Sequence, residues 1–132
     1  MLRNNLYTIS SFAFSDTKDQ LTVQIILNKE HPIFEGHFPG NPILPGVCTV
    51  QIISELLEKA LEKELMLTKA SNIKYLGFIN PVTTPSIQFD LVIKNTETGS
   101  ISCNAMVSDG GNKLCSFKGE YLLQESSSHI PQ

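Results

Sequence analysis

The sequence predicts an α+β domain in which a curved antiparallel sheet wraps around one long central helix. Apolar residues at helical spacing extend over one long segment only, from Val47 to about Leu67, directly after a Pro-Gly pair. Alternating apolar and polar residues, the pattern of half-buried strands, occur on both sides of that segment. Several strands and a single helix bury their apolar faces together only if the sheet curls around the helix.

Six segments have the alternation expected of strands. They are residues 6–14, 21–27, 72–80, 87–93, 101–107 and 114–124. The Asp109-Gly110 pair is a strong hairpin signal, and Pro81 marks the end of the third strand or an edge position. We therefore predict a single domain over residues 1–124, followed by a disordered polar tail at 125–132.

Composition excludes several classes of function. The 132 residues carry a net charge of -3 with no run of basic residues, which argues against nucleic acid as a partner. No apolar run approaches a membrane span and no signal peptide is recognisable, so we expect a cytoplasmic protein without membrane insertion. The three cysteines have no metal-type spacing, and His31, His37 and Cys48 fit no zinc pattern. We expect buried thiols, no metal and no cofactor.

One loop is unusually rich in residues that shape the backbone. The stretch HPIFEGHFPGNPILPGV, from His31 to Val47, contains four prolines and three glycines. It presents one histidine, His37, in its middle and then leads directly into the predicted helix. The first N–H groups of a helix have no intrahelical partner and attract negative charge. The sequence thus places a base and an anion-attracting helix start close together.

The residues His37-Phe38-Pro39-Gly40-x-Pro42-x-x-Pro45-Gly46-Val47 resemble the signature of the 3-hydroxyacyl-(acyl carrier protein) dehydratases. These are hotdog-fold enzymes of fatty acid synthesis, and the resemblance is clear from about Ile26 to Leu57. It implies a hotdog fold and a substrate carried on acyl carrier protein. It also implies a homodimer, or an oligomer built from dimers, with active sites at the subunit interface.

The resemblance also implies roles for individual residues. Dehydration needs a base at C2, an acid at the 3-hydroxyl and a donor to the thioester carbonyl. His37 matches the catalytic histidine, and Gly46 matches the position whose backbone N–H polarises the carbonyl. The carbonyl of Ile43 matches the group that orients the imidazole. Phe38 and Val47 adjoin the loop, where they would line an acyl tunnel or pack in the core.

The second catalytic position departs from the family. The family carries a carboxylate fourteen residues after the histidine, and this chain has Gln51 there. An amide can donate and accept hydrogen bonds but cannot act as a general acid. Either Gln51 holds the 3-hydroxyl or a water while His37 makes both proton transfers, or another carboxylate substitutes, or the protein binds acyl groups without dehydrating them. Glu55 and Glu35 are the nearest candidates, although a surface Glu55–Lys59 pair and an exposed loop acid are simpler interpretations.

The expected function is dehydration of 3-hydroxyacyl-(acyl carrier protein) to the trans-2-enoyl thioester in fatty acid or related lipid biosynthesis. Two alternatives stay open: a non-catalytic acyl-binding subunit, alone or partnered with an intact dehydratase, and a hotdog acyl thioesterase. An acidic carrier protein would need a basic docking surface near the tunnel mouth. The lysines that could supply it are Lys29, Lys69, Lys74 and Lys118.

Overall fold

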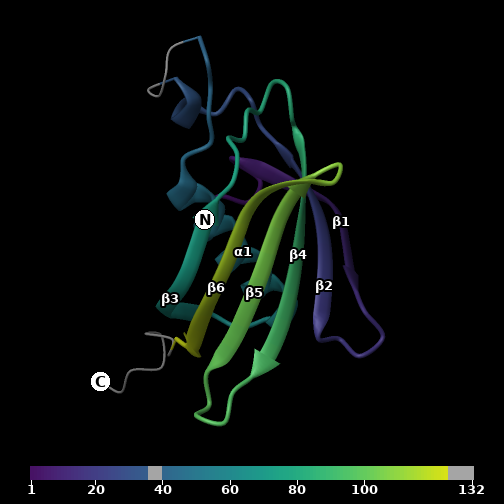
Figure 1. The fold of residues 1–132 in the computed structure, drawn as a ribbon, viewed down its shortest axis with the longest axis vertical. Helices are drawn as coiled ribbons and strands as arrows, with labels where there is room; N and C mark the ends of the chain where they lie inside the picture. Colours follow the sequence, from purple (N-terminus) through teal and green to yellow (C-terminus); the bar gives the residue numbers. More distant parts are fainter. Residues whose placement is uncertain (36–39, 125–132) are drawn as a thin grey trace, which may run out of the picture.

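The computed structural model describes residues 1–35 and 40–124 (Figure 1). A six-stranded antiparallel sheet curves around one long helix, which confirms the predicted α+β class. The elements in chain order are β1 (Tyr7–Phe14), β2 (Gln20–Leu27), the short 3-10 helix η1 (Pro32–Phe34), α1 (Gly46–Leu61), β3 (Leu65–Tyr75), β4 (Ser86–Asn95), β5 (Ile101–Asp109) and β6 (Asn112–Leu123).

The strand order in the sheet is β1-β2-β4-β5-β6-β3. The chain therefore leaves the sheet after β2, forms α1 against one face, and re-enters at the far edge as β3. The three following strands then fill the gap, β4 beside β2 and β6 beside β3. As a result β3 is an edge strand, and one of its sides has no hydrogen-bonding neighbour among the described residues.

The core lies between α1 and the concave face of the sheet. The helix contributes a stripe of fully buried side chains, Ile52, Ile53, Leu56 and Leu57. β2, β4, β5 and β6 contribute alternate residues, as in Phe117 and Tyr121 of β6. Apolar residues recur with a period of 3.6 on the helix and of 2 on the strands. Each of these elements therefore has one apolar face, and these faces meet in the core.

The predicted helix was too long and the predicted third strand was misplaced. The helix ends at Leu61, where Glu62 takes a left-handed conformation with φ 53° and its N–H donates to the Glu58 carbonyl. The Glu58 carboxylate then accepts from the Leu65 N–H at 2.9 Å and helps to close the turn into β3. The charged residues at 62–64 have good helix propensity, so the sequence pattern predicted that the helix continues through them. In the structure the chain instead pairs with β6 from Leu65 onward, which ends the helix.

The first turn of the helix is less buried than its composition suggests. Cys48 and Thr49 are buried, whereas Val47 is 74% exposed and Gln51 is also exposed. The sequence places few charges in this turn, yet in the single chain only part of it is buried. A solvent-facing valine on an otherwise uncharged turn is a surface suited to contact with another molecule.

Candidate active site

The beginning of α1 is fixed by backbone geometry and without any side-chain cap. Gly40 has φ 81°, a conformation that glycine adopts without strain. The Leu44 N–H donates to the Ile79 carbonyl at 2.8 Å, which ties the end of the loop to the segment after β3. Pro45 follows as an extended N-cap with φ -60° and ψ 141°, and it makes no side-chain capping bond. The helix start is thus held in place while its amide groups stay available.

Two of those amide groups lack an acceptor among residues 1–35 and 40–124. The N–H groups of Cys48 and Thr49 donate to the Pro45 carbonyl at 2.9 and 3.4 Å, but those of Gly46 and Val47 have no such partner. Together with the helix dipole, these free donors favour an oxygen that carries negative charge. The helix start can therefore bind a carbonyl oxygen and polarise it.

A pocket of about 510 Å³ opens at this helix start. Most of its lining is apolar. The lining residues are Ile43, Leu44, Pro45, Gly46, Thr49, Tyr75, Leu76, Gly77, Phe78, Ile79, Leu114 and Cys115. An apolar cavity with a few polar groups at one end is the usual form of a small-molecule site. It has room for an acyl chain, with the helix N–H groups at the position of the polar head.

The sequence-predicted binding residues divide into three groups. Gly46 and Ile43 line the pocket. Val47 is next to Gly46 but faces solvent and is not part of the lining. His37 and Phe38 lie outside the described residues, so their predicted roles as base and tunnel wall stay predictions. Tyr75 was not foreseen, because the alternation around it indicated only a strand.

Gln51 lies on the solvent side of α1 and is oriented by a neighbour on the next turn. Its Nε2 donates to Oε2 of Glu55 at 2.9 Å. With the amide nitrogen engaged in this way, the Gln51 carbonyl oxygen is turned away from Glu55 and free to accept a hydrogen bond. The residue at the family's carboxylate position is therefore an oriented hydrogen-bonding group without an exchangeable acid proton.

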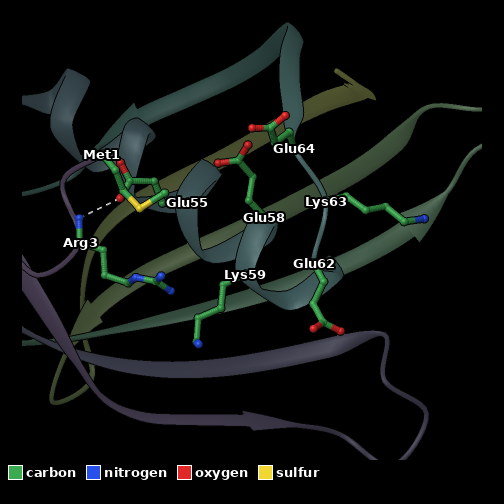
Figure 2. Close-up of a pocket in the computed structure, with 8 residues that line it drawn as sticks. All are labelled: Met1, Arg3, Glu55, Glu58, Lys59, Glu62, Lys63 and Glu64. Atoms are coloured by element: carbon green, nitrogen blue, oxygen red, sulfur yellow. Dashed lines mark hydrogen bonds between the residues drawn. The ribbon is translucent and has the colours of Figure 1, made fainter. Parts of the chain in front are cut away.

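Glu55 is neither the surface partner of Lys59 nor a free acid. Its side chain is only 4% exposed, and its carboxylate also accepts from the Leu2 N–H at 2.8 Å, the Arg3 N–H at 3.0 Å and the Tyr7 hydroxyl at 3.1 Å. Figure 2 shows it directed at the N-terminal segment, with Lys59 pointing elsewhere. Lys59 instead places its Nζ 5.4 Å from the ring centre of Phe12. The interpretation of Glu55 as a surface partner of Lys59 was therefore wrong, and the hydrogen bonds from four groups argue against Glu55 as the substitute carboxylate.

These contacts also decide its ionisation. Burial on its own would raise the pKa of Glu55, but the hydrogen bonds from Gln51, Leu2, Arg3 and Tyr7 outweigh it and hold the pKa below its usual value. Burial and the nearby Glu55 carboxylate raise the pKa of Tyr7 well above its usual value, so Tyr7 stays a donor. Glu55 is thus a structural carboxylate that is charged at neutral pH and has no proton to transfer.

The other acidic and histidine candidates have simple roles in the structure. Glu35 is exposed and directly precedes the undescribed residues. His31 caps η1, where its Nδ1 accepts from the Ile33 N–H at 3.0 Å. A second pocket, of about 330 Å³, lies along the later turns of α1 and is lined by Glu55, Glu58, Glu62 and Glu64 together with Met1, Arg3, Lys59 and Lys63 (Figure 2). Its mixed charges offer no single ligand chemistry.

The cysteines do not supply a nucleophile or a metal site. Cys48, Cys103 and Cys115 are buried and unpaired, and burial raises the pKa of each thiol, to about 12 for Cys103. In the described part of the chain, no group of three His, Cys, Asp or Glu side chains could hold a metal ion. No helix in the described ranges is long and apolar enough to cross a membrane.

One helix wrapped by an antiparallel sheet, with an apolar pocket at the helix start, defines a hotdog-fold domain. A family model described as ApeI-like, ApeI dehydratase, matches residues 13–117. The chain belongs to this family of dehydratases.

Relatives and solved structures agree with this assignment. The 3-hydroxyacyl-(acyl-carrier-protein) dehydratase FabZ of Lactiplantibacillus plantarum is 29% identical over 109 residues, covering 73% of this chain and 74% of the relative. That of Levilactobacillus brevis is 25% identical over 132 residues, covering 89% and 86%. The dehydratase heterocomplex ApeI:P from Xenorhabdus doucetiae has a TM-score of 0.69 at 14% identity, covering 86% and 96%. A putative thioesterase from Lactococcus lactis has a TM-score of 0.64 at 10% identity, covering 89% and 94%. The two structural matches show the fold alone.

Because its folded pKa is depressed, Glu55 stabilises the fold above the pKa of an unfolded glutamate, about 4.3, and this contribution is lost as the pH falls through the lower folded value. We predict that Glu55→Gln lowers the free energy of unfolding by about 2 kcal/mol at pH 7, since a buried acceptor is replaced by a group that also presents donors. Urea unfolding at pH 7 and at a pH near 3 measures the free energy of unfolding of both proteins. We expect the difference in this free energy between wild type and Glu55→Gln to be smaller at the lower pH. Glu97→Gln, at an exposed glutamate, is the control; equal losses in both variants would contradict the role of Glu55.

Proposed function

We propose that this protein dehydrates 3-hydroxyacyl thioesters of acyl carrier protein to trans-2-enoyl thioesters in fatty acid or related lipid biosynthesis. The observation that carries the proposal is the helix start at Gly46, which has no side-chain cap and lines an apolar pocket of about 510 Å³, and whose N–H has no acceptor among the described residues. A thioester carbonyl bound there would be polarised while the acyl chain lies in the apolar part. Membership of a dehydratase family favours this reaction over thioester hydrolysis.

His37 is the proposed base. It lies nine residues before Gly46, outside the described residues, and its role rests on the sequence motif. An imidazole has an unperturbed pKa near neutrality and suits removal of a C2 proton acidified by the carbonyl. The C2–H electron pair then moves toward the carbonyl oxygen, and the resulting enolate expels the 3-hydroxyl. The proton taken from C2 leaves with that hydroxyl as water, so that one histidine serves both transfers.

Gln51 is the proposed holder of the leaving hydroxyl. Its Nε2 is engaged by Glu55, and its carbonyl oxygen is left as an acceptor for the substrate O–H. This arrangement orients the 3-hydroxyl but supplies no proton. General acid–base partners typically contribute roughly 10²–10⁴-fold to a rate, so we expect turnover slower than with a carboxylate at this position.

A non-catalytic acyl-binding subunit is the second candidate function, and one observation favours it. The amide of Gln51 replaces the group that would act as an acid, while the pocket and helix start are kept. The dehydratase complex from Xenorhabdus doucetiae is a heterocomplex, which supplies a precedent on the same fold for pairing two different chains. In that case this chain would complete a site together with an intact dehydratase partner.

The proposed assembly is a homodimer formed around the pocket. Four apolar side chains more than half exposed surround the helix start: Val47, Tyr75, Leu76 and Phe78, here called the apolar rim. The rim continues into β3, which lies at a sheet edge. A second copy would cover the rim, pair with the edge and enclose the exposed Gln51.

Three of the four lysines proposed for carrier-protein docking share one face. Lys118 lies opposite Asn72, Lys74 opposite Ser116 and Lys69 opposite Glu120. Residues 116, 118 and 120 alternate with buried residues of β6, so these pairs are on the outer face of the β3–β6 ribbon. Lys74 directly precedes Tyr75 of the pocket, and Lys29 lies apart in the turn after β2. We propose that Lys69, Lys74 and Lys118 dock an acidic carrier protein.

Dehydration of a short 3-hydroxyacyl-(acyl carrier protein), and hydration of the enoyl product, test the main proposal. We expect wild type to turn over, His37→Ala to lose at least roughly 10²-fold, and Gln51→Glu to gain rate. In Gln51→Glu the new carboxyl would lie beside the charged Glu55, which would raise one pKa of the pair and keep a proton available near neutrality. An inert wild type with an active Gln51→Glu would instead support the non-catalytic subunit, and release of free acid would support the thioesterase.

The dimer is tested by size-exclusion chromatography with light scattering. We expect a mass twice the 14.6 kDa of one chain. Met66→Lys combined with Phe78→Lys, both on the β3 side, should shift the protein to the monomer and abolish activity. The matched control combines Phe14→Lys with Ile26→Lys, at exposed apolar residues of β1 and β2. A monomeric wild type that is fully active would contradict the assembly.

Docking is tested with two forms of one substrate. Lys74→Glu combined with Lys118→Glu should raise KM roughly tenfold for the carrier-protein thioester, because charge steering is reversed. The same variant should act normally on the pantetheine thioester, which has no protein surface to dock. Lys94→Glu, at an exposed lysine of β4, is the control. Equal effects on both substrates would show that the lysines do not dock the carrier.

A further inference from the structure

Tyr75, the last residue of β3, packs directly against the first residue of α1. A methyl group built on Gly46 would lie 2.5 Å from Cζ and 2.7 Å from Oη of Tyr75. A side chain at this position would have to displace the tyrosine ring, so glycine allows the close packing. The contact places a phenol hydroxyl beside the free N–H of Gly46.

The two donors are close enough to share one acceptor. The Cβ position of a residue lies about 2.5 Å from its own nitrogen, since both atoms are bonded to Cα. The Tyr75 hydroxyl is therefore within roughly 5 Å of the Gly46 nitrogen. Two donors at that separation can both reach an oxygen that lies about 2.9 Å from each.

A further polar residue lines the same pocket. Thr49, in the first turn of α1, is only 2% exposed and contributes to the lining. The rest of the lining is mostly apolar. Gly46, Thr49 and Tyr75 thus bring polar groups to a cavity of acyl size.

We propose that Tyr75 is a catalytic residue whose hydroxyl, together with the Gly46 N–H, donates hydrogen bonds to the thioester carbonyl oxygen of the substrate. This inference rests on the proposed dehydration. When the base removes the C2 proton, the C–H electron pair forms the C1–C2 double bond and the carbonyl π pair moves onto the oxygen. Tyr75 stabilises that charge without giving up its proton. The carbonyl then re-forms, the C1–C2 pair becomes the C2–C3 double bond, and the C3–O bond breaks. The departing hydroxide takes the C2 proton from the protonated base and leaves as water.

The arrangement suits a site that has an amide at position 51. Without a general acid at the 3-hydroxyl, the enolate must persist until the leaving group departs, and two donors stabilise it better than one. Partial burial, and to a smaller extent the neighbouring Cys115, raise the pKa of Tyr75. The phenol therefore remains a neutral donor throughout the working range of a histidine base.

The kinetic test is Tyr75→Phe, which keeps the ring against Gly46 and removes only the hydroxyl. We expect kcat to fall roughly 10²–10³-fold, the usual effect of removing one oxyanion donor, with KM changed less than about threefold. Tyr121→Phe is the matched control, because the Tyr121 hydroxyl bonds Ser54 at 2.8 Å and does not line the pocket. A Tyr75→Phe enzyme with wild-type kcat would overturn the proposal.

A spectroscopic test separates this proposal from the dehydration itself. A saturated acyl-pantetheine labelled with ¹³C at the carbonyl cannot be dehydrated, and its infrared carbonyl stretch reports polarisation. We expect a shift to lower frequency on binding to wild type, a smaller shift with Tyr75→Phe, and the full shift with Tyr121→Phe. Equal shifts in wild type and Tyr75→Phe, or no shift at all, would refute the role of Tyr75. An inert wild type that still gives the expected shifts would refute the dehydration only.

Discussion

The structure depends on the packing of one helix, α1, against the concave face of the sheet. Ile52, Ile53, Leu56 and Leu57 of α1 have no accessible surface, and β2, β4, β5 and β6 direct alternate side chains into the same core. Buried apolar area contributes about 25 cal/mol per Å², so this contact is a large source of stability. The start of the helix is held in addition by the bond from the Leu44 N–H to the Ile79 carbonyl. Core packing and this bond together fix the position of Gly46 and of the pocket beside it.

Glu55 couples this core to the surface of the helix. Oε1 of its carboxylate accepts from the Arg3 N–H and the Tyr7 hydroxyl, and Oε2 accepts from the Leu2 N–H and the amide of Gln51. A charged group at 4% exposure is tolerated because every oxygen is hydrogen-bonded. The same bonds that remove Glu55 from acid–base chemistry give Gln51 its orientation. A structural role thereby shapes a residue of the candidate site.

The candidate site lies where two surfaces of the single chain remain incomplete. The apolar rim and the edge of β3 face solvent, and the Gly46 N–H has no acceptor among the described residues. The proposed second copy would cover the apolar rim and pair with the edge of β3. The proposed thioester oxygen would accept the hydrogen bond from the Gly46 N–H. In this view the proposed dimer contact and the proposed substrate site adjoin each other at Tyr75. Activity would then depend on dimer formation because the two sites share residues, and no conformational change would be needed.

The sequence by itself determined the fold class, five of the six strands to within a few residues, and the family. Alternation and helical spacing report which face of each element is apolar, and the loop motif reports a helix start after Pro45-Gly46. It misjudged residues 62–75, because Glu62, Lys63 and Glu64 have good helix propensity while the pairing of β3 with β6 is a long-range interaction. Only the tertiary structure decided the burial of Glu55 against the N-terminal segment and the contact of Tyr75 with Gly46. Each of these joins residues far apart in the sequence, and the distance between them is set by how the sheet closes around the helix. The bond between Gln51 and Glu55, by contrast, follows from the four-residue spacing of neighbours on one helix.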